Sequence, residues 1–270
     1  MLGAILGDIV GSAYEHDAPK TTDFPLFGEF SRFTDDTVLT VATAHAILTG
    51  RSWADAYHDF GNRHPGAGYG GAFRAWLARE DRQPYGSWGN GAAMRVSPIG
   101  WAWSSIGDVL REAERSAAVT HDHREGILGA QAVALAVFLA RTGASKPEIR
   151  RIVTRHTGYP LDRTLDEIRP RYRFDVSSQR SVPEAITAFL ESESVEHAIR
   201  LAVSLGGDAD TQAAIAGGIA EAFYGEVPAE LAAEAMGRLT PALRGIVTEF
   251  RLRYAGRARH RIASSLRSSQ

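Results

Sequence analysis

Two clusters of acids and hydroxyls are the residues best suited to chemistry in this 270-residue chain. The first is Thr34-Asp35-Asp36-Thr37, and the second is Asp208-Ala209-Asp210-Thr211, directly after Gly206-Gly207. Both stand at the start of an apolar segment with helical spacing. They offer only oxygen ligands, which hard divalent cations such as Mg²⁺ and Mn²⁺ prefer. Since four converging carboxylates would repel one another without a cation, the clusters together predict a composite metal site.

Helix capping is the alternative interpretation of each cluster taken alone. Ser, Thr and Asp are common at the first turn of a helix, where they accept backbone N–H groups and favour the positive end of the helix dipole. The second Asp of each cluster exceeds what a cap requires. The glycines before Asp208 also let the backbone approach a ligand closely. We therefore favour the metal site, whose ions could orient a sugar diol and activate a water molecule.

Glu15 stands where an apolar N-terminal segment gives way to a loop. A carboxylate in this position could be a metal ligand or a base that activates water. From this residue alone, a solvated Glu at the end of a helix is the more frequent explanation.

A glycine-rich segment, Gly86-Ser87-Trp88-Gly89-Asn90-Gly91, could present backbone N–H groups to phosphate oxygens. Ser87 adds a hydroxyl, and Trp88 adds an aromatic face for a base or a sugar. The segment is neither a P-loop nor a dinucleotide fingerprint, because no Gly-Lys-Ser/Thr follows it and no strand precedes it. A plain turn is the alternative. Arg95, further along, could bind a phosphate or pair with a buried acid.

His121 and His123 flank Asp122. Two histidines at this spacing can bind zinc, but further ligands at zinc spacing are missing nearby. Capping of the following helix by Thr120 or Asp122 is one alternative. Hydrogen bonding from His121 to a ligand hydroxyl is the other.

Composition excludes several classes of function. The chain has no cysteine, so thiolate metal sites, disulfides and a cysteine nucleophile are absent. A formal net charge of -2 gives no electrostatic case for binding nucleic acid or an anionic membrane. The apolar start, Met1 to Tyr14, has no basic region and carries Asp8, so we expect neither a signal peptide nor a membrane span. We expect a cytoplasmic monomer.

Apolar spacing predicts an all-α protein with one domain, because strand-like alternation is essentially absent and no linker divides the chain. Residues 16–33 are predicted to form a long loop, and residues 158–181 to hold little regular structure beyond a turn near Leu165. Residues 256–270 are rich in Arg and Ser and predict a flexible basic tail, which leaves a domain of residues 1–255. The predicted helices cover residues 2–10, 35–48, 53–63, 73–80, 106–119, 125–141, 147–156, 183–190, 195–205, 211–224, 229–239 and 241–254.

The ordered motifs resemble those of the ADP-ribosylglycohydrolase family, which includes the dinitrogenase reductase-activating glycohydrolase. The resemblance extends from Gly3 to about Tyr224. The segments that carry it are Gly7-Asp8-Ile9-Val10-Gly11-Ser12-Ala13-Tyr14-Glu15, Phe33-Thr34-Asp35-Asp36-Thr37, Gly89-Asn90-Gly91-Ala92-Ala93-Met94-Arg95, Thr120-His121-Asp122-His123-Arg124-Glu125-Gly126 and Gly206-Gly207-Asp208-Ala209-Asp210-Thr211.

The resemblance implies an orthogonal multi-helix bundle with a central cleft for two Mg²⁺ ions, or Mn²⁺ in their place. By matching position, the implied metal ligands are Thr34, Asp35, Asp36, Asp208, Asp210 and Thr211. The implied substrate-binding residues are Gly86, Ser87, Trp88, Gly89, Asn90, Gly91 and His121. Asp36 and Glu15 are our candidates for catalytic residues that assist the attacking water.

The implied reaction is hydrolysis of the glycosidic bond between ADP-ribose and an acceptor. The acceptor could be a protein side chain such as arginine or serine, a nucleobase, or a small molecule. Two other functions stay open: an all-α His/Asp metal-dependent phosphohydrolase, and a non-catalytic ADP-ribose-binding or structural protein. Retention of all four Asp residues argues against the last of these.

Overall fold

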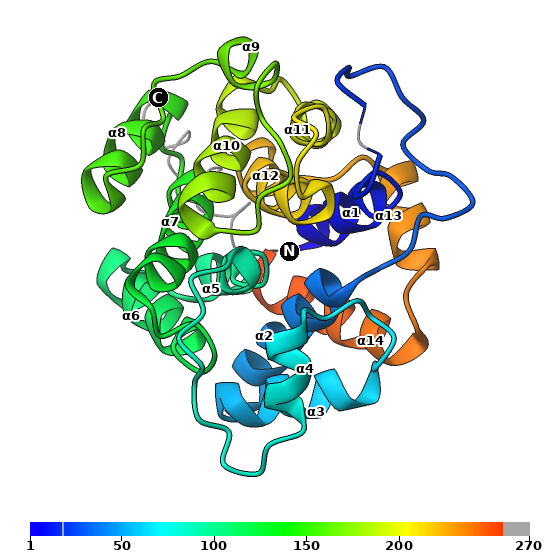
Figure 1. Ribbon diagram of the computed structural model, residues 1–270, viewed down its shortest axis with the longest axis vertical. Helices are drawn as coiled ribbons and strands as arrows, with labels where there is room; N and C mark the ends of the chain where they lie inside the picture. Colours follow the sequence, from blue (N-terminus) through cyan, green and yellow to red (C-terminus); the bar gives the residue numbers. More distant parts are fainter. Residues whose placement is uncertain (18, 256–270) are drawn as a thin grey trace, which may run out of the picture.

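The computed structural model describes residues 1–17 and 19–255 and confirms the predicted all-α class (Figure 1). Within these residues there is no strand, and extended pairing is limited to a single bridge between Gly89 and Ser177. The predicted basic tail, residues 256–270, lies outside the described residues. No helix in the described part of the chain is long and apolar enough to cross a bilayer.

Fourteen α-helices are present in the described residues, together with a 3₁₀ turn at Asn90–Ala92 and a π-helical turn at Arg251–Ala255. The α-helices are α1 (Leu2–Gly11), α2 (Asp35–Thr49), α3 (Trp53–Arg63), α4 (Gly71–Leu77), α5 (Ser97–Ala102), α6 (Ile106–Ala117), α7 (Arg124–Arg141), α8 (Lys146–Thr157), α9 (Leu165–Ile168), α10 (Ser178–Glu191), α11 (Val195–Val203), α12 (Ala209–Tyr224), α13 (Ala229–Gly237) and α14 (Pro241–Phe250).

The central contact is between α1 and α12, which lie side by side in the middle of the molecule (Figure 1). Every residue of α1 is buried. Gly3, Gly7 and Gly11 allow the two backbones to meet, because a Cβ atom on Gly7 would lie 2.0 Å from the carbonyl oxygen of Ala213. This contact fixes the start of α12, and with it Asp208 and Asp210, relative to α1.

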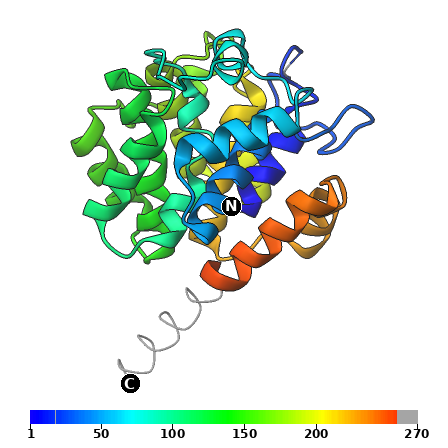
Figure 2. The same cartoon turned by 90° about the horizontal axis from the view of Figure 1, so that it is seen from below.

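The remaining helices surround this pair. α10 and α11 pack on α12, α7 packs on α12 and carries α5, α6 and α8, and α2 packs on α3 and α14. The view turned by 90° shows α13 and α14 along one edge of the molecule (Figure 2). One hydrophobic cluster includes residues from Met1 to Phe250. The acid-bearing starts of α2 and α12 therefore project from a shared, tightly packed core.

Several predicted helix ends differ by two or three residues from the structure, and two predictions are wrong by more than that. α10 begins at Ser178, five residues before the predicted start at Pro183, which lies inside the helix. Long-range contacts explain the early start, since the N–H of Ser178 donates to the carbonyl of Trp88 at 3.0 Å and its hydroxyl to that of Gly89 at 2.8 Å. The short helix α5 was not predicted at all, because its six residues carry no clear apolar period.

Candidate metal centre and ligand cavity

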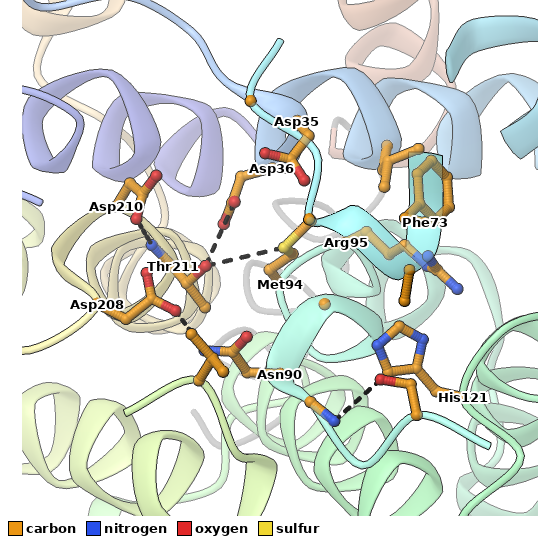
Figure 3. A pocket seen from close by; sticks show the side chains of 18 of the residues that line it. Asp35, Asp36, Phe73, Asn90, Met94, Arg95, His121, Asp208, Asp210 and Thr211 are labelled. Carbon is orange, nitrogen blue, oxygen red and sulfur yellow. Dashed lines mark hydrogen bonds between the residues drawn. The ribbon is translucent and has the colours of Figure 1, made fainter. Parts of the chain in front are cut away.

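A cavity of about 360 Å³ lies between the starts of α2 and α12 (Figure 3). Its volume suits a small-molecule ligand. The 3₁₀ turn at Asn90–Ala92 and the start of α4 close its other sides. Of the predicted site residues, it is lined by Glu15, Asp35, Asp36, Ser87, Gly89, Asn90, Gly91, His121, Asp208, Asp210 and Thr211. Segments nearly 200 residues apart in the sequence thus meet at one cleft.

Carboxylates gather at one side of this cavity in two overlapping groups. Potential ligand atoms of Asp8, Asp36 and Asp210 lie within 4.8 Å of one another, and so do those of Glu15, Asp208 and Asp210. Asp210 belongs to both groups. All of these side chains are buried except that of Glu15, which is half-buried. The geometry could hold a cation, which supports the predicted composite acidic site.

Asp36 and Thr211 link the two helices directly. The Thr211 hydroxyl donates to Asp36 Oδ2 at 3.3 Å, while Asp36 Oδ1 is buried and has no hydrogen-bond partner among the described residues. Asp35 lies beside them, and its backbone N–H donates to the carbonyl of Ala67 at 2.8 Å. A buried carboxylate oxygen without a partner costs free energy unless a proton or a cation occupies it. The residues present therefore fit a metal site.

Asp8 is a member of the acidic cluster for which no role was predicted from the sequence. It is fully buried in α1 and accepts hydrogen bonds from the Thr34 backbone at 2.9 Å, the Thr34 hydroxyl at 2.6 Å, the Thr37 backbone at 3.1 Å and the Thr37 hydroxyl. The signal in the sequence was a single carboxylate in an otherwise apolar helix. Through these hydrogen bonds, Asp8 of α1 fixes the first turn of α2.

Thr34 lies behind the cavity, where it caps α2. Its hydroxyl donates to Asp8 and accepts the N–H of Asp36 at 3.2 Å. Only one lone pair of this hydroxyl is left for another partner. Thr34 is therefore both a helix cap, the alternative considered above, and a part of the acidic cluster.

The crowding of acids changes their protonation. Burial, and then the charge of Asp210, raise the pKa of Asp8 to about 7 and that of Asp35 to about 8. The same two causes raise the pKa of Asp36 and of Asp208 well above the ordinary value. Asp208 is partly compensated, because Asn90 Nδ2 donates to its Oδ2 at 2.7 Å. Repulsion of this kind is what a divalent cation would relieve.

Glu15 projects from the loop between α1 and α2. Burial and the neighbouring charge of Asp210 raise its pKa. The loop is fixed at its middle by Lys20, whose ammonium donates to the carbonyls of Arg169 at 3.1 Å, Tyr172 at 2.8 Å and Leu205. Because Leu205 immediately precedes Gly206-Gly207, this contact ties the loop to the start of α12.

The glycine-rich loop is divided between the cavity and the surface. Ser87, Gly89, Asn90 and Gly91 line the cavity, whereas Gly86 does not, and the Trp88 side chain is 57% exposed outside it. Three of the loop's N–H groups donate within the protein: that of Gly86 to Asp122 at 2.7 Å, that of Gly89 to Ser87 at 3.2 Å and that of Asn90 to Val176 at 2.8 Å.

His121 lines the cavity beside this loop, and Arg95 lies deeper. His123, not Thr120 or Asp122, caps α7 by accepting the N–H of Glu125 at 3.1 Å, so the predicted cap residue was wrong. Asp122 instead accepts the N–H of Gly86.

Neither His121 nor His123 belongs to a cluster of potential metal ligands among the residues described. Arg95 forms no ion pair with a described acid; it donates to the Thr120 hydroxyl.

The fold and the cleft define an all-helical protein with a buried acidic centre beside a glycine-rich loop. The chain matches the ADP-ribosylglycohydrolase family model over residues 1–259 and belongs to that family. The predicted family is therefore confirmed, and with it the prediction of an ADP-ribosylglycohydrolase-type enzyme.

Known relatives cover most of the chain. ADP-ribosylhydrolase ARH3 of Homo sapiens is 30% identical over 305 residues, covering 83% of this chain and 84% of that protein. ADP-ribosylarginine hydrolase Tri1 of Pseudomonas putida is 27% identical, covering 83% of this chain and 69% of that protein. A solved structure described as an ADP-ribosylglycohydrolase-related protein complex superposes with a TM-score of 0.67 at 26% identity, covering 92% of this chain and 95% of that chain.

Proposed function

We propose that the protein is a Mg²⁺-dependent hydrolase that cleaves the glycosidic bond between ADP-ribose and an acceptor and releases ADP-ribose. The observation that carries the proposal is the convergence of Asp36, Asp208 and Asp210 on one cavity with the glycine-rich loop. The names of the relatives, an ADP-ribosylhydrolase and an ADP-ribosylarginine hydrolase, support the substrate class.

The acidic cluster is proposed to bind two Mg²⁺ ions, with Mn²⁺ as a substitute. When bound, such ions would coordinate ribose hydroxyls and lower the pKa of a water molecule. Asp8 would orient the ligands from behind by its hydrogen bonds to Thr34 and Thr37. The proposed ligands are Thr34, Asp35, Asp36, Asp208, Asp210 and Thr211.

Glu15 and Asp36 are proposed to move the proton of the attacking water. A carboxylate is a better general base when its pKa is raised toward the working pH, and burial and Asp210 raise that of Glu15. Glu15 also projects from a loop at the cavity wall, so it can face a ligand without being enclosed by the other acids. Asp36 offers its unpartnered Oδ1.

The glycine-rich loop is proposed to bind the diphosphate. Because Gly86, Gly89 and Asn90 use their N–H groups within the protein, the contacts would come from the Ser87 hydroxyl and from the N–H groups of Ser87 and Trp88, which have no acceptor among the described residues. The exposed indole of Trp88 would stack on the adenine at the cavity mouth.

Release of free ADP-ribose from an ADP-ribosylarginine peptide and from an ADP-ribosylserine peptide tests this proposal, with Mg²⁺ and with a chelator. We expect release that needs the metal and falls by at least about 100-fold in Asp210→Asn, the loss expected when a metal ligand or its support is removed. Glu15→Gln should lower kcat about 100-fold or more if it moves the proton. Glu29→Gln, exposed in the same loop, is the matched control.

The same assay separates the alternatives. Tight ADP-ribose binding without release from either peptide would favour another acceptor or a non-catalytic binder. Hydrolysis of a phosphate ester that survives in Asp210→Asn but not in His121→Gln would favour the phosphohydrolase. Neither binding nor release would overturn the proposed site.

A further inference from the structure

Arg95 is a fully buried cation at the floor of the cavity with no acid to balance it among the described residues. Its Nη2 donates to the carbonyl of Ser116 at 3.2 Å and to the Thr120 hydroxyl at 2.9 Å, and its guanidinium lies 4.0 Å above the ring of Tyr57. Its Nε and Nη1 are buried without a hydrogen-bond partner. Keeping an unpaired charge buried costs free energy, which is consistent with a role for Arg95 at the cavity.

The hydroxyl of Thr120 connects Arg95 to His121. Thr120 Oγ1 lies 2.8 Å from His121 Nδ1. A guanidinium only donates hydrogen bonds, so the bond from Arg95 occupies a lone pair of this oxygen. The oxygen therefore has two partners and a single proton to give.

The direction of that proton follows from what each partner can accept. A guanidinium has no free lone pair, whereas an imidazole nitrogen without a proton is a hydrogen-bond acceptor. The favoured arrangement therefore has Thr120 donating to His121 Nδ1. Because Arg95 polarises the hydroxyl, it strengthens this donation. Nδ1 then carries no proton, which leaves the proton of neutral His121 on Nε2.

Nε2 faces the glycine-rich loop. A Cβ atom on Gly91 would lie 3.1 Å from it and one on Gly89 would lie 3.8 Å from it. Nε2 has no hydrogen-bond partner among the described residues. Burial, and then the charge of Arg95, lower the pKa of His121 well below its ordinary value. The neighbouring Asp122 carboxylate accepts the N–H of Gly86 at 2.7 Å.

We propose that Arg95 and Thr120 are positioning residues that hold His121 neutral with its proton on Nε2, as a fixed hydrogen-bond donor to a ligand oxygen lying against the glycine-rich loop. The identity of that oxygen, from the diphosphate or a ribose of ADP-ribose, rests on the proposed function. The arrangement of Arg95, Thr120 and His121 does not rest on it.

The first test reads the tautomer of His121 by long-range ¹H–¹⁵N NMR of the ligand-free full chain, with His121→Gln to assign the signals. We expect a proton on Nε2 in the wild type and in Thr120→Ser, which keeps the hydroxyl. Thr120→Val keeps the shape and removes the donor, so we expect the proton to move to Nδ1 or to exchange between the two nitrogens. A proton on Nδ1 in the wild type, or an unchanged spectrum in Thr120→Val, would overturn the proposal.

The second test is calorimetric titration of ADP-ribose into four proteins: the wild type, Thr120→Val, Thr120→Ser and Arg95→Met. Thr120→Val and Arg95→Met should each bind about tenfold more weakly, the effect of one hydrogen bond, and Thr120→Ser should recover most of the loss. Equal affinity in all four proteins would overturn the role in ligand binding. If the wild type binds no ADP-ribose, the proposed function fails while the NMR result still decides on the tautomer. Unfolding curves of each variant serve as the control that the variant is folded.

Discussion

At the scale of single residues, Asp8 has an unusual place, because it touches the acidic cluster without lining the cavity. It joins α1 to the first turn of α2 through Thr34 and Thr37. We expect Asp8→Asn to weaken Mg²⁺ or Mn²⁺ binding by about 10-fold to 100-fold, as replacements behind metal ligands do, because the amide would turn a donor toward N–H groups. Calorimetric titration of chelator-treated protein measures the effect.

Asp17→Asn is the control for Asp8→Asn, since Asp17 is exposed in the following loop. It should bind metal as the wild type does. Equal metal affinity in Asp8→Asn and in Asp17→Asn would contradict a supporting role for Asp8.

Gly91 is a second residue whose role can be isolated. A methyl group on it would lie 3.1 Å from Nε2 and 3.3 Å from Cε1 of His121, tighter than ordinary contact. We expect Gly91→Ala to displace the imidazole and to weaken ADP-ribose binding about tenfold, because one hydrogen bond is lost. Gly107→Ala in α6 has open space around its Cβ and should bind normally. Titration of both variants decides, and normal affinity in Gly91→Ala would show that His121 does not contact the ligand.

At the scale of elements, local signals predicted most helices correctly, and the errors have physical causes. Asp35 and Asp36 mark the start of α2 as acids at a helix start do. The start of α10 was missed because proline often occupies the first turn, whereas here Ser178 begins the helix by pairing with Trp88 and Gly89. Such long-range pairing leaves no periodic trace in the sequence.

The contact between α1 and α12 is the element-scale feature most sensitive to substitution. A Cβ atom on Gly7 would meet the backbone of Ala213 at 2.0 Å, and backbone cannot move aside as a side chain can. We expect Gly7→Ala to lower the free energy of unfolding by about 3 kcal/mol or more. Gly245→Ala, in α14 with open space around it, should be neutral or stabilising. Urea unfolding compares the two, and similar midpoints would mean that the helices can separate without cost.

At the scale of the whole molecule, the sequence predicted which side chains gather but not how each is used. Asp36, Asp208 and Asp210 meet because α2 and α12 both start at the cleft, and their residue types were enough to identify them. The engagement of Asn90 with Asp208 depends on a contact across 118 residues, which only the fold reveals. The role of Asp8 could not be predicted for the same reason, since its contacts with Thr34 and Thr37 depend on the fold.

The acidic cluster also makes stability depend on pH and metal. Since the pKa of Asp8 is raised to about 7 and that of Asp35 to about 8, the folded protein holds these protons more tightly than the unfolded chain. This contribution to stability is complete at low pH and is lost as the pH rises through about 8. We expect the Tm of chelator-treated protein to fall by about 5 °C between pH 6.5 and 8, a window above the ordinary pKa of histidine.

Excess Mg²⁺ should reverse this trend, because the cation binds the deprotonated carboxylates and relieves their repulsion. The rise in Tm on adding Mg²⁺ should therefore be larger at pH 8 than at pH 6.5. Asp210→Asn removes the charge that raises the pKa of both Asp8 and Asp35, so its metal-free Tm should depend less on pH than that of the wild type. Differential scanning calorimetry measures each Tm. A metal-free wild type whose Tm stays level or rises over this range would show that the pKa values of Asp8 and Asp35 are not raised in the folded protein.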